Sequence, residues 1–263
     1  TPVLVNGSAN NANFSYNLFM NSTNSTAGIN TAAASKTVFI VNATVSNFTI
    51  YNNTFKEFYA DMGGKGEYPT LNGSDGGNLT LINFSAEAQN IIIAYNNFTN
   101  SKGGDGSQGS ETVFCPSCDG GSGGAGGNVY GIVINEFSNV NISFNVFSYL
   151  NGGLGGYGED GGTSNGGGGL GGNGGNSYGL VLNNFSNLSF SDNNVSLLIG
   201  GYGGTGGGAH YHRDGGVGGN GGDAYGVVMK DFNALNFSSN LFFLSFGGAG
   251  GIGGNGSAVL WYG

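Results

Sequence analysis

A segment of about 48 residues recurs along the chain, and this internal repeat limits the possible folds more than any other feature. Tyr130, Tyr178 and Tyr225 each begin a near-identical stretch (YGIVI, YGLVL and YGVVM), and the three tyrosines are 48 and 47 residues apart. Weaker copies lie upstream and read NNANFSYNLF, VSNFTIYNNTF and AQNIIIAYNNF. Repeats of this length are typical of chains in which one small unit stacks on the next and buries a continuous core.

One asparagine holds the same place in every copy, and the positions five before, three before and two after it are always apolar. The six asparagines are Asn17, Asn53, Asn96, Asn145, Asn193 and Asn240. Apolar residues two apart indicate a strand with one buried face. An asparagine between two such strands fits a corner, because it tolerates left-handed backbone and hydrogen-bonds nearby backbone groups. We therefore predict two short strands per copy and an internal ladder of stacked amides.

Glycine-rich segments follow the copies, and 57 of the 263 residues are glycine. Most of these segments are two arms of GGx triplets around a tip that does not repeat, at about residues 63–77, 103–128, 152–176, 200–223 and 247–256. Glycine at two of every three positions favours polyproline II helices, which have three residues per turn and pack closely. An isolated arm would be a flexible linker, whereas arms that recur copy after copy can stack and exchange backbone hydrogen bonds.

The composition excludes several classes of protein. Collagen is excluded because the chain has 3 prolines and no strict glycine period. Disorder is disfavoured because Leu, Ile, Val and Phe make up about a quarter of the residues and the net charge is only −9. The six Lys and Arg are too dispersed for a nucleic-acid-binding patch, and no run of about 18 apolar residues predicts a membrane span.

Asn-x-Ser/Thr sequons are about three times as frequent as random placement of these residues would give. This excess predicts a secreted or cell-surface protein with covalent N-glycans, and the start TPVLVNGS suggests a mature form after signal-peptide removal. The competing interpretation is that Asn, Ser and Thr favour the same turns and exposed faces. The 17 candidate glycosylation sites are Asn6, Asn13, Asn21, Asn24, Asn42, Asn47, Asn52, Asn72, Asn78, Asn83, Asn97, Asn141, Asn184, Asn187, Asn194, Asn236 and Asn255.

The few reactive side chains do not form a recognisable catalytic set. Cys115 and Cys118 are interpreted as a small disulfide that clips a loop, although a lone CxxC could also be redox-active or half of a zinc site. The cluster at 210–214 (HYHRD) fits a solvated tip, a contact or assembly site, or a weak metal site. Glu136 and Asp231 take equivalent outward positions, and no acids converge as hydrolases and lyases require. We therefore predict no enzyme activity, no resident metal and no cofactor other than covalent glycans.

Both ends of the chain resemble unpaired strands without a cap. Val3–Val5 begins a strand, and 258–263 (AVLWYG) falls where the first strand of a seventh copy would start. Open strand edges invite pairing with another chain, so we predict head-to-tail assembly. The alternatives are that the ends fold back locally, or that a removed segment carried the cap. The predicted assembly residues are Val3, Leu4, Val5, Val259, Leu260, Trp261 and Tyr262.

The alternating strand, the turn and the NISFNVF pattern resemble the rungs of right-handed parallel β-helix proteins of the pectate-lyase-like superfamily, over about half the chain. The glycine-rich segments depart from that family and are similar to arms of snow-flea antifreeze proteins and of phage tail-fibre adhesins. These resemblances imply one all-β domain over 1–263. It would be a right-handed parallel β-helix of about six coils with stacked polyproline II hairpin insertions.

The function predicted from the sequence is structural. We expect the subunit of an extracellular, N-glycosylated filament or sheath, a head-to-tail homopolymer whose glycosylation resembles that of archaeal surface proteins. The alternative is a cell-surface or tail-fibre-type adhesin that binds a receptor or glycan through its variable loop tips, since loops commonly carry binding residues.

Overall fold

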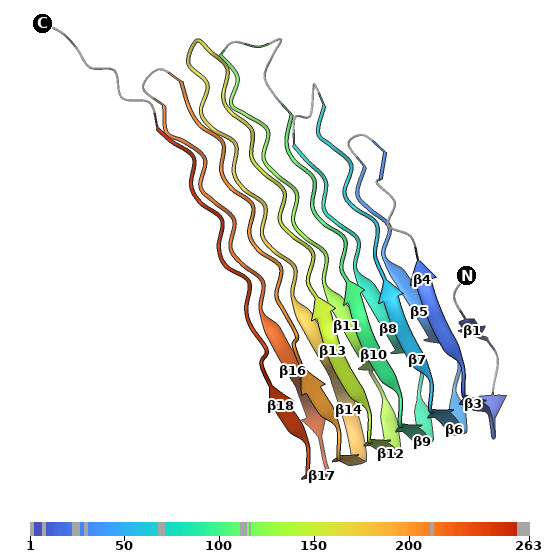
Figure 1. Ribbon diagram of the computed structural model, residues 1–263. Helices are drawn as coiled ribbons and strands as arrows, with labels where there is room; N and C mark the ends of the chain where they lie inside the picture. Colours follow the sequence, from blue (N-terminus) through green and yellow to red (C-terminus); the bar gives the residue numbers. More distant parts are fainter. Residues whose placement is uncertain are drawn as a thin grey trace, which may run out of the picture.

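The computed structural model describes residues 3–6, 9–22, 27–28, 31–67, 72–110, 115, 117–210 and 213–256. Within these ranges the chain is all-β and forms no helix. The strands gather at one end of the molecule, and the glycine-rich arms extend from them side by side (Figure 1). Chain order follows position across the array, so that each copy of the repeat lies beside the next.

The strands of the described residues fall into six successive sets, which we call layers 1 to 6. Layer 1 holds β1 (Val3–Val5), β2 (Ala9–Asn10), β3 (Asn13–Ser15) and β4 (Leu18–Ser22), and layer 2 holds β5 (Lys36–Val41), β6 (Val45–Tyr51) and β7 (Thr54–Phe58). Layer 3 holds β8 (Leu79–Phe84), β9 (Ala88–Ala94) and β10 (Asn97–Lys102), and layer 4 holds β11 (Val129–Ile134), β12 (Phe137–Ser143) and β13 (Val146–Asn151). Layer 5 holds β14 (Ser177–Ser191) and β15 (Asn194–Ser196), and layer 6 holds β16 (Ala224–Phe232), β17 (Leu235–Ser238) and β18 (Leu241–Phe243).

Every strand pairing in the described residues is parallel and joins one layer to the next. The larger sheet has 12 strands: nine follow the path β1-β5-β8-β11-β14-β12-β9-β6-β2, β3 pairs with β6, and β16 and β17 pair with β14. The smaller sheet has six strands in the order β18-β15-β13-β10-β7-β4. Register follows the repeat, as in the pairing of Ile142 with Ile93 on one side and Phe190 on the other. An all-β chain with large parallel sheets is therefore what the repeat builds.

The prediction of two strands per copy is wrong, because most layers contain three strand segments. In layer 4 the YGIVI stretch forms β11, exposed Asn135 and Glu136 separate it from β12, and a second break at Asn145 separates β12 from β13. In layer 5 the same two segments run on as the single strand β14. The YGIVI-type stretch has its own buried positions, such as Ile132 and Ile134, and so it pairs with its neighbours as a ladder in its own right.

The corner prediction placed the ladder asparagines in the left-handed conformation, and this is wrong for all six. The positive φ belongs to the residue just before each of them, which turns the chain while the asparagine side chain points inward. These preceding residues are Tyr16, Asn52, Tyr95, Phe144, Asp192 and Ser239, with φ between 50° and 59°. The left-handed region costs a non-glycine residue roughly 1–2 kcal/mol. The inward amide and the paired strands on both sides must offset that cost in each layer.

The core is a set of columns in which each side chain packs on its equivalent in the next layer. Phe55, Phe98 and Phe147 are fully buried, and their rings stack at centroid distances of 5.0 and 4.7 Å. Isoleucine, leucine, valine and further phenylalanines, such as Phe48 and Phe190, fill the other columns, with almost no exposed surface in the middle layers. This burial is the main source of stability, since each fully buried side chain of this size contributes about 1.5–3 kcal/mol.

The arms pack through their backbones. The Gly156 N–H donates to Gly124 O at 2.8 Å, and Gly156 O accepts from Gly172 N–H at 2.9 Å, so one glycine joins three arms. A Cβ atom on Gly156 would lie 1.9 Å from the carbonyl oxygen of Ser107 in another arm. Only glycine allows that approach, which explains why two of every three arm residues are glycine.

Candidate functional site

The internal asparagine ladder links the layers. Asn53, Asn96, Asn145 and Asn193 are at most 1% exposed. Asn145 Oδ1 accepts from the backbone N and the Nδ2 of Asn96 at 2.9 and 3.0 Å. Asn145 Nδ2 donates to Ile93 O at 2.8 Å, and to Ser143 O and Asn193 Oδ1 at 3.0 Å. Each interior amide therefore bonds to the layers on both sides and to its own strand.

Both end layers expose apolar side chains, and in layer 6 some of them, such as Phe232 and Phe242, continue columns that are buried in the inner layers. In layer 1, Leu4 is 53% and Leu18 is 59% exposed, while Val3 and Val5 pack partly against the core. In layer 6 the uncovered side chains are between 37% and 54% exposed, and they are Phe232, Leu235, Phe237, Leu241, Phe242, Phe243, Leu244 and Phe246. Of the predicted assembly residues, Val259, Leu260, Trp261 and Tyr262 lie outside the described residues.

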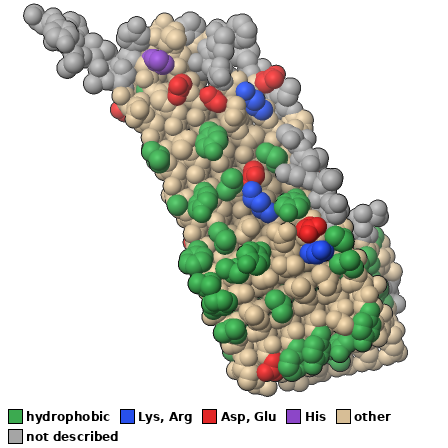
Figure 2. All heavy atoms as spheres, viewed as in Figure 1, with side chains coloured by type: hydrophobic (Ala, Val, Ile, Leu, Met, Phe, Trp, Pro, Cys, Tyr) green, Lys and Arg blue, Asp and Glu red, His purple; other side chains and the backbone are tan. Residues whose placement is uncertain are grey.

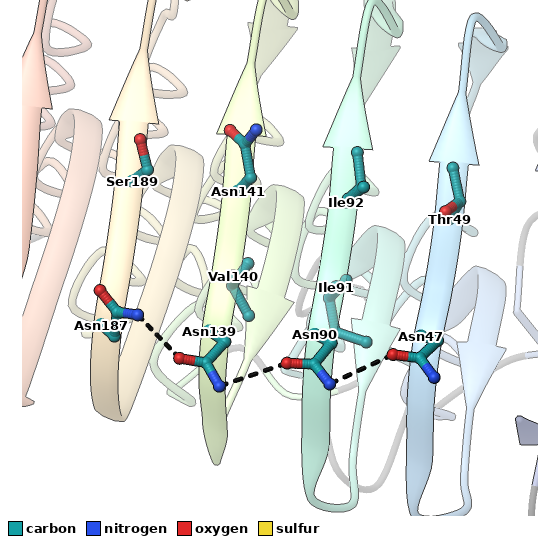
Figure 3. A pocket seen from close by; sticks show the side chains of 10 residues that line it. All are labelled: Asn47, Thr49, Asn90, Ile91, Ile92, Asn139, Val140, Asn141, Asn187 and Ser189. Carbon is teal, nitrogen blue, oxygen red and sulfur yellow. Dashed lines mark hydrogen bonds between the residues drawn. The ribbon is translucent and has the colours of Figure 1, made fainter. Parts of the chain in front are cut away.

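A second row of asparagines, which the sequence analysis missed, runs along the outside of the larger sheet (Figure 3). From the second layer onward, each Nδ2 in the row donates to the asparagine Oδ1 of the preceding layer, at distances of 3.1, 3.1, 3.2 and 2.7 Å. The row borders a shallow groove of about 480 Å3. A signal existed, because an asparagine stands six residues before the ladder asparagine in five of the six copies. The members are Asn11, Asn47, Asn90, Asn139 and Asn187, all with φ between 51° and 57°.

Most sequon asparagines lie on the surface. Asn83 and Asn194 are half-buried, the side chain of Asn21 is not described, and Asn24 lies outside the described residues. Asn47 and Asn187 belong to the outer row and use their amides within it. The exposed sequon asparagines are Asn6, Asn13, Asn42, Asn47, Asn52, Asn72, Asn78, Asn97, Asn141, Asn184, Asn187, Asn236 and Asn255.

The arm tips hold the remaining candidates. Cys115 and Cys118 are joined by a disulfide within one tip. His210 borders a groove of about 630 Å3 together with Asp160, whereas Tyr211 and His212 lie outside the described residues. Among the side chains that the structure describes, no group of three or more His, Cys, Asp or Glu is arranged to hold a metal ion.

A second shallow groove, of about 500 Å3, lies on the strands. Glu136 and Asp231 are exposed and line it, with Asn184 between them in register.

Across the described ranges, no helix has the length and apolar character that crossing a membrane would need.

A tyrosine ladder connects the strands with the arms. The rings of Tyr130, Tyr178 and Tyr225 stack at 4.8 and 5.0 Å. Burial raises the pKa of Tyr130 above its ordinary value, and the hydrogen bond that Asn128 donates to its hydroxyl opposes this shift. The Tyr225 hydroxyl donates to Asp223 Oδ2 at 2.8 Å, and this bond together with the carboxylate charge raises the pKa of Tyr225.

We expect Asp223→Asn to lower the pKa of Tyr225, because the substitution removes both the hydrogen-bond acceptor and the charge. An absorbance titration above pH 9 measures this, with Tyr225→Phe assigning the transition. An unchanged titration curve in Asp223→Asn would contradict this assignment.

Burial of Tyr130 has a separate consequence for stability. Because folding raises the pKa of Tyr130, the folded state favours its neutral phenol. That stabilisation is complete below the unfolded pKa of about 10 and is lost as pH rises through the folded pKa.

Comparison with known proteins gives little. No protein-family model matches the chain, and no curated protein is detectably similar to it. A springtail antifreeze protein from Granisotoma rainieri is 24% identical, with 74% of this chain and 95% of that chain covered and a TM-score of 0.16. It is described as a bundle of nine polyproline type II helices whose crystal waters match the ice lattice. The Streptococcus pneumoniae surface protein and adhesin PfbA is 9% identical over 91% of both chains, with a TM-score of 0.10. At these TM-scores neither likeness supports an argument about this chain.

Proposed function

We propose that this chain is a structural subunit of an extracellular, N-glycosylated surface filament or sheath in which copies stack end to end. The proposal includes a fold more specific than parallel sheets: a right-handed parallel β-helix of about six coils with polyproline II arms inserted as hairpins. The layer-to-layer register and the backbone bonds between arms support this fold. The many exposed sequons support a glycosylated outer surface.

The observation that carries the proposal is the apolar surface at the two ends. Phe147 is fully buried in layer 4, whereas Phe242 in the same column of layer 6 is 42% exposed. Phe190 is fully buried, and its neighbour Phe237 is 47% exposed. Contiguous apolar surface of this kind marks an interaction site, and unpaired strand edges add hydrogen-bonding capacity. A contact between opposite ends of identical copies is heterologous, and it extends into a filament when its rotation does not close a ring.

The second candidate is an adhesin that binds through the arms and their tips. Its support is the exposure of apolar side chains along the arms, such as Tyr157 and Tyr202, which are each 56% exposed. Figure 2 shows separate hydrophobic side chains spread over this part of the surface. An adhesin of this kind would need no end-to-end contact, so the two candidates are separable.

Electron microscopy of the purified chain tests the proposal. The unmodified protein is expected to form filaments, and Phe242→Asp is expected to leave folded monomers because it places a charge on the end surface. Ile252→Asp is the matched control, since Ile252 is 77% exposed on an arm of the same layer and lies away from the strands. A chain that ends at Ser257 tests the contribution of residues 258–263. Monodisperse particles from the unmodified chain would overturn the filament and favour the adhesin.

A further inference from the structure

We infer that copies of this chain stack in one direction only, with layer 6 of one copy against layer 1 of the next. The register continues the asparagine ladder from Asn240 of the first copy to Asn17 of the second. This inference rests on the proposed filament and adds the hydrogen bonds that would fix its polarity, together with its register and its contact residues. Its basis is a set of hydrogen-bonding groups without a partner among the described residues: an acceptor in layer 1 and donors in layer 6.

The asparagine ladder has a direction. In every interior step the backbone N and the Nδ2 of one asparagine donate to the Oδ1 of the asparagine in the next layer. The backbone N and the Nδ2 of Asn17 both donate to Asn53 Oδ1 at 2.9 Å. Those of Asn193 both donate to Asn240 Oδ1 at 3.0 Å. The ladder therefore presents different groups at its two ends.

At layer 1 the unused group is an acceptor, and at layer 6 the unused groups are donors. Among the described residues, nothing donates to Asn17 Oδ1. The backbone N of Asn240 donates to no described residue, and its Nδ2 keeps a single bond, to Phe190 O at 2.8 Å. Layer 1 against layer 1 would bring two acceptors together, and layer 6 against layer 6 would bring donors together. Only the contact between layers 6 and 1 pairs donors with an acceptor, which selects one polarity.

The backbone follows the same direction. Thr54 N–H donates to Asn17 O at 2.9 Å, and Leu241 N–H donates to Asn193 O at 2.8 Å. Continuing this pattern across the contact places the Leu18 N–H of the second copy on Asn240 O of the first. The side-chain amides and the strand backbones therefore require the same register.

The apolar columns also agree with this register. The column that begins at Phe19 passes through Phe55, Phe98, Phe147 and Val195 and ends at Phe242. The contact would therefore set Phe19 of the second copy on Phe242 of the first. Phe19 already stacks on Phe55 at 4.7 Å, so its other ring face is available for a similar contact.

Cysteine cross-linking between two variants tests polarity and register together. Leu18 and Leu241 are the two ends of one outward-facing column, as are Met20 and Phe243. Neighbours in such a column lie about 4.8 Å apart, within the Cα separation of about 4.4–6.8 Å that a disulfide spans. All four side chains are exposed, and the native cysteines are already paired. Four variants follow: Leu18→Cys, Met20→Cys, Leu241→Cys and Phe243→Cys.

Mild oxidation is expected to give covalent dimers only when Leu18→Cys is mixed with Leu241→Cys, or Met20→Cys with Phe243→Cys. The crossed mixtures are the controls, because they are two residues out of register, about 6.6 Å along the strand. Dimers from one variant alone would mean that like ends meet and would overturn the polarity. Cross-links in the crossed mixtures, or filaments with no cross-link in either matched mixture, would overturn the register. The absence of filaments from the unmodified chain would instead overturn the proposed function.

Discussion

Replacing Asn145 by leucine is expected to lower the free energy of unfolding by about 3 kcal/mol or more. The substitution removes the acceptor for the backbone N–H of Asn96 and the donor to Ile93 O and Ser143 O, all at a buried site. A buried polar group left without its partner costs about 1–3 kcal/mol. The loss is large against the total stability of about 5–15 kcal/mol of an ordinary domain.

Urea unfolding followed by circular dichroism measures this loss. Asn141→Ala is the matched control, because Asn141 lies in the same strand set, is exposed and has no side-chain hydrogen bond to the described residues. Substitutions at such surface positions usually change stability by less than about 0.5 kcal/mol. Equal unfolding midpoints for Asn145→Leu and Asn141→Ala would show that the internal ladder contributes nothing to stability.

The inner columns were predictable because the repeat made them visible. Six asparagines flanked by apolar residues at the same distances can hydrogen-bond to one another and bury those apolar residues only if the copies stack in register. Ile50, Ile93 and Ile142 do lie in one buried column. A single copy would not have sufficed. Any one of these short stretches could as well belong to an isolated strand or a buried turn.

The corners were less predictable because several residue types can occupy them. Asn, Tyr, Phe, Asp and Ser all adopt the left-handed conformation at one equivalent position, so backbone geometry and not residue identity is repeated there. The predicted number of strands was wrong because most copies are interrupted twice, in layer 4 at exposed Asn135 and Glu136 and again at Asn145. Layer 5 shows that the same place can continue as a strand.

Some sequon asparagines also have a structural role. Asn47 and Asn187 each fit an N-glycosylation sequon, yet both side chains serve the outer row of amide hydrogen bonds. Asn78 Oδ1 likewise accepts from the backbone N of Asn128 at 2.7 Å. Part of the asparagine excess therefore has a structural cause that is independent of any glycan. The exposed sequon asparagines without such bonds, such as Asn97 and Asn141, are the stronger glycosylation candidates.

Replacing Gly203 by alanine is expected to disrupt the packing of the arms and to lower the free energy of unfolding by about 1–3 kcal/mol. A Cβ atom at this position would lie 2.0 Å from the carbonyl oxygen and 2.5 Å from the carbonyl carbon of Gly219. Both atoms belong to backbone, so no flexible side chain can move aside and the arms must separate. Overpacking of a close-packed interior costs about 1–3 kcal/mol, and here it would also weaken the neighbouring Gly216 and Gly219 backbone bonds.

Gly250 provides the control, because it is the equivalent glycine one layer further on. A Cβ atom there would lie 3.5 Å from Gly219 O, which is an ordinary contact. Neither glycine is in the left-handed region that alanine avoids, so the two positions differ in the space around the added Cβ atom. Gly250→Ala should therefore leave stability unchanged or raise it slightly, because alanine restricts the unfolded chain. Hydrogen exchange of the arm amides provides a local readout, and protection should fall in Gly203→Ala alone. If both variants kept the same protection and the same unfolding midpoint, the arms would have room for side chains, and close packing would no longer account for their glycine content.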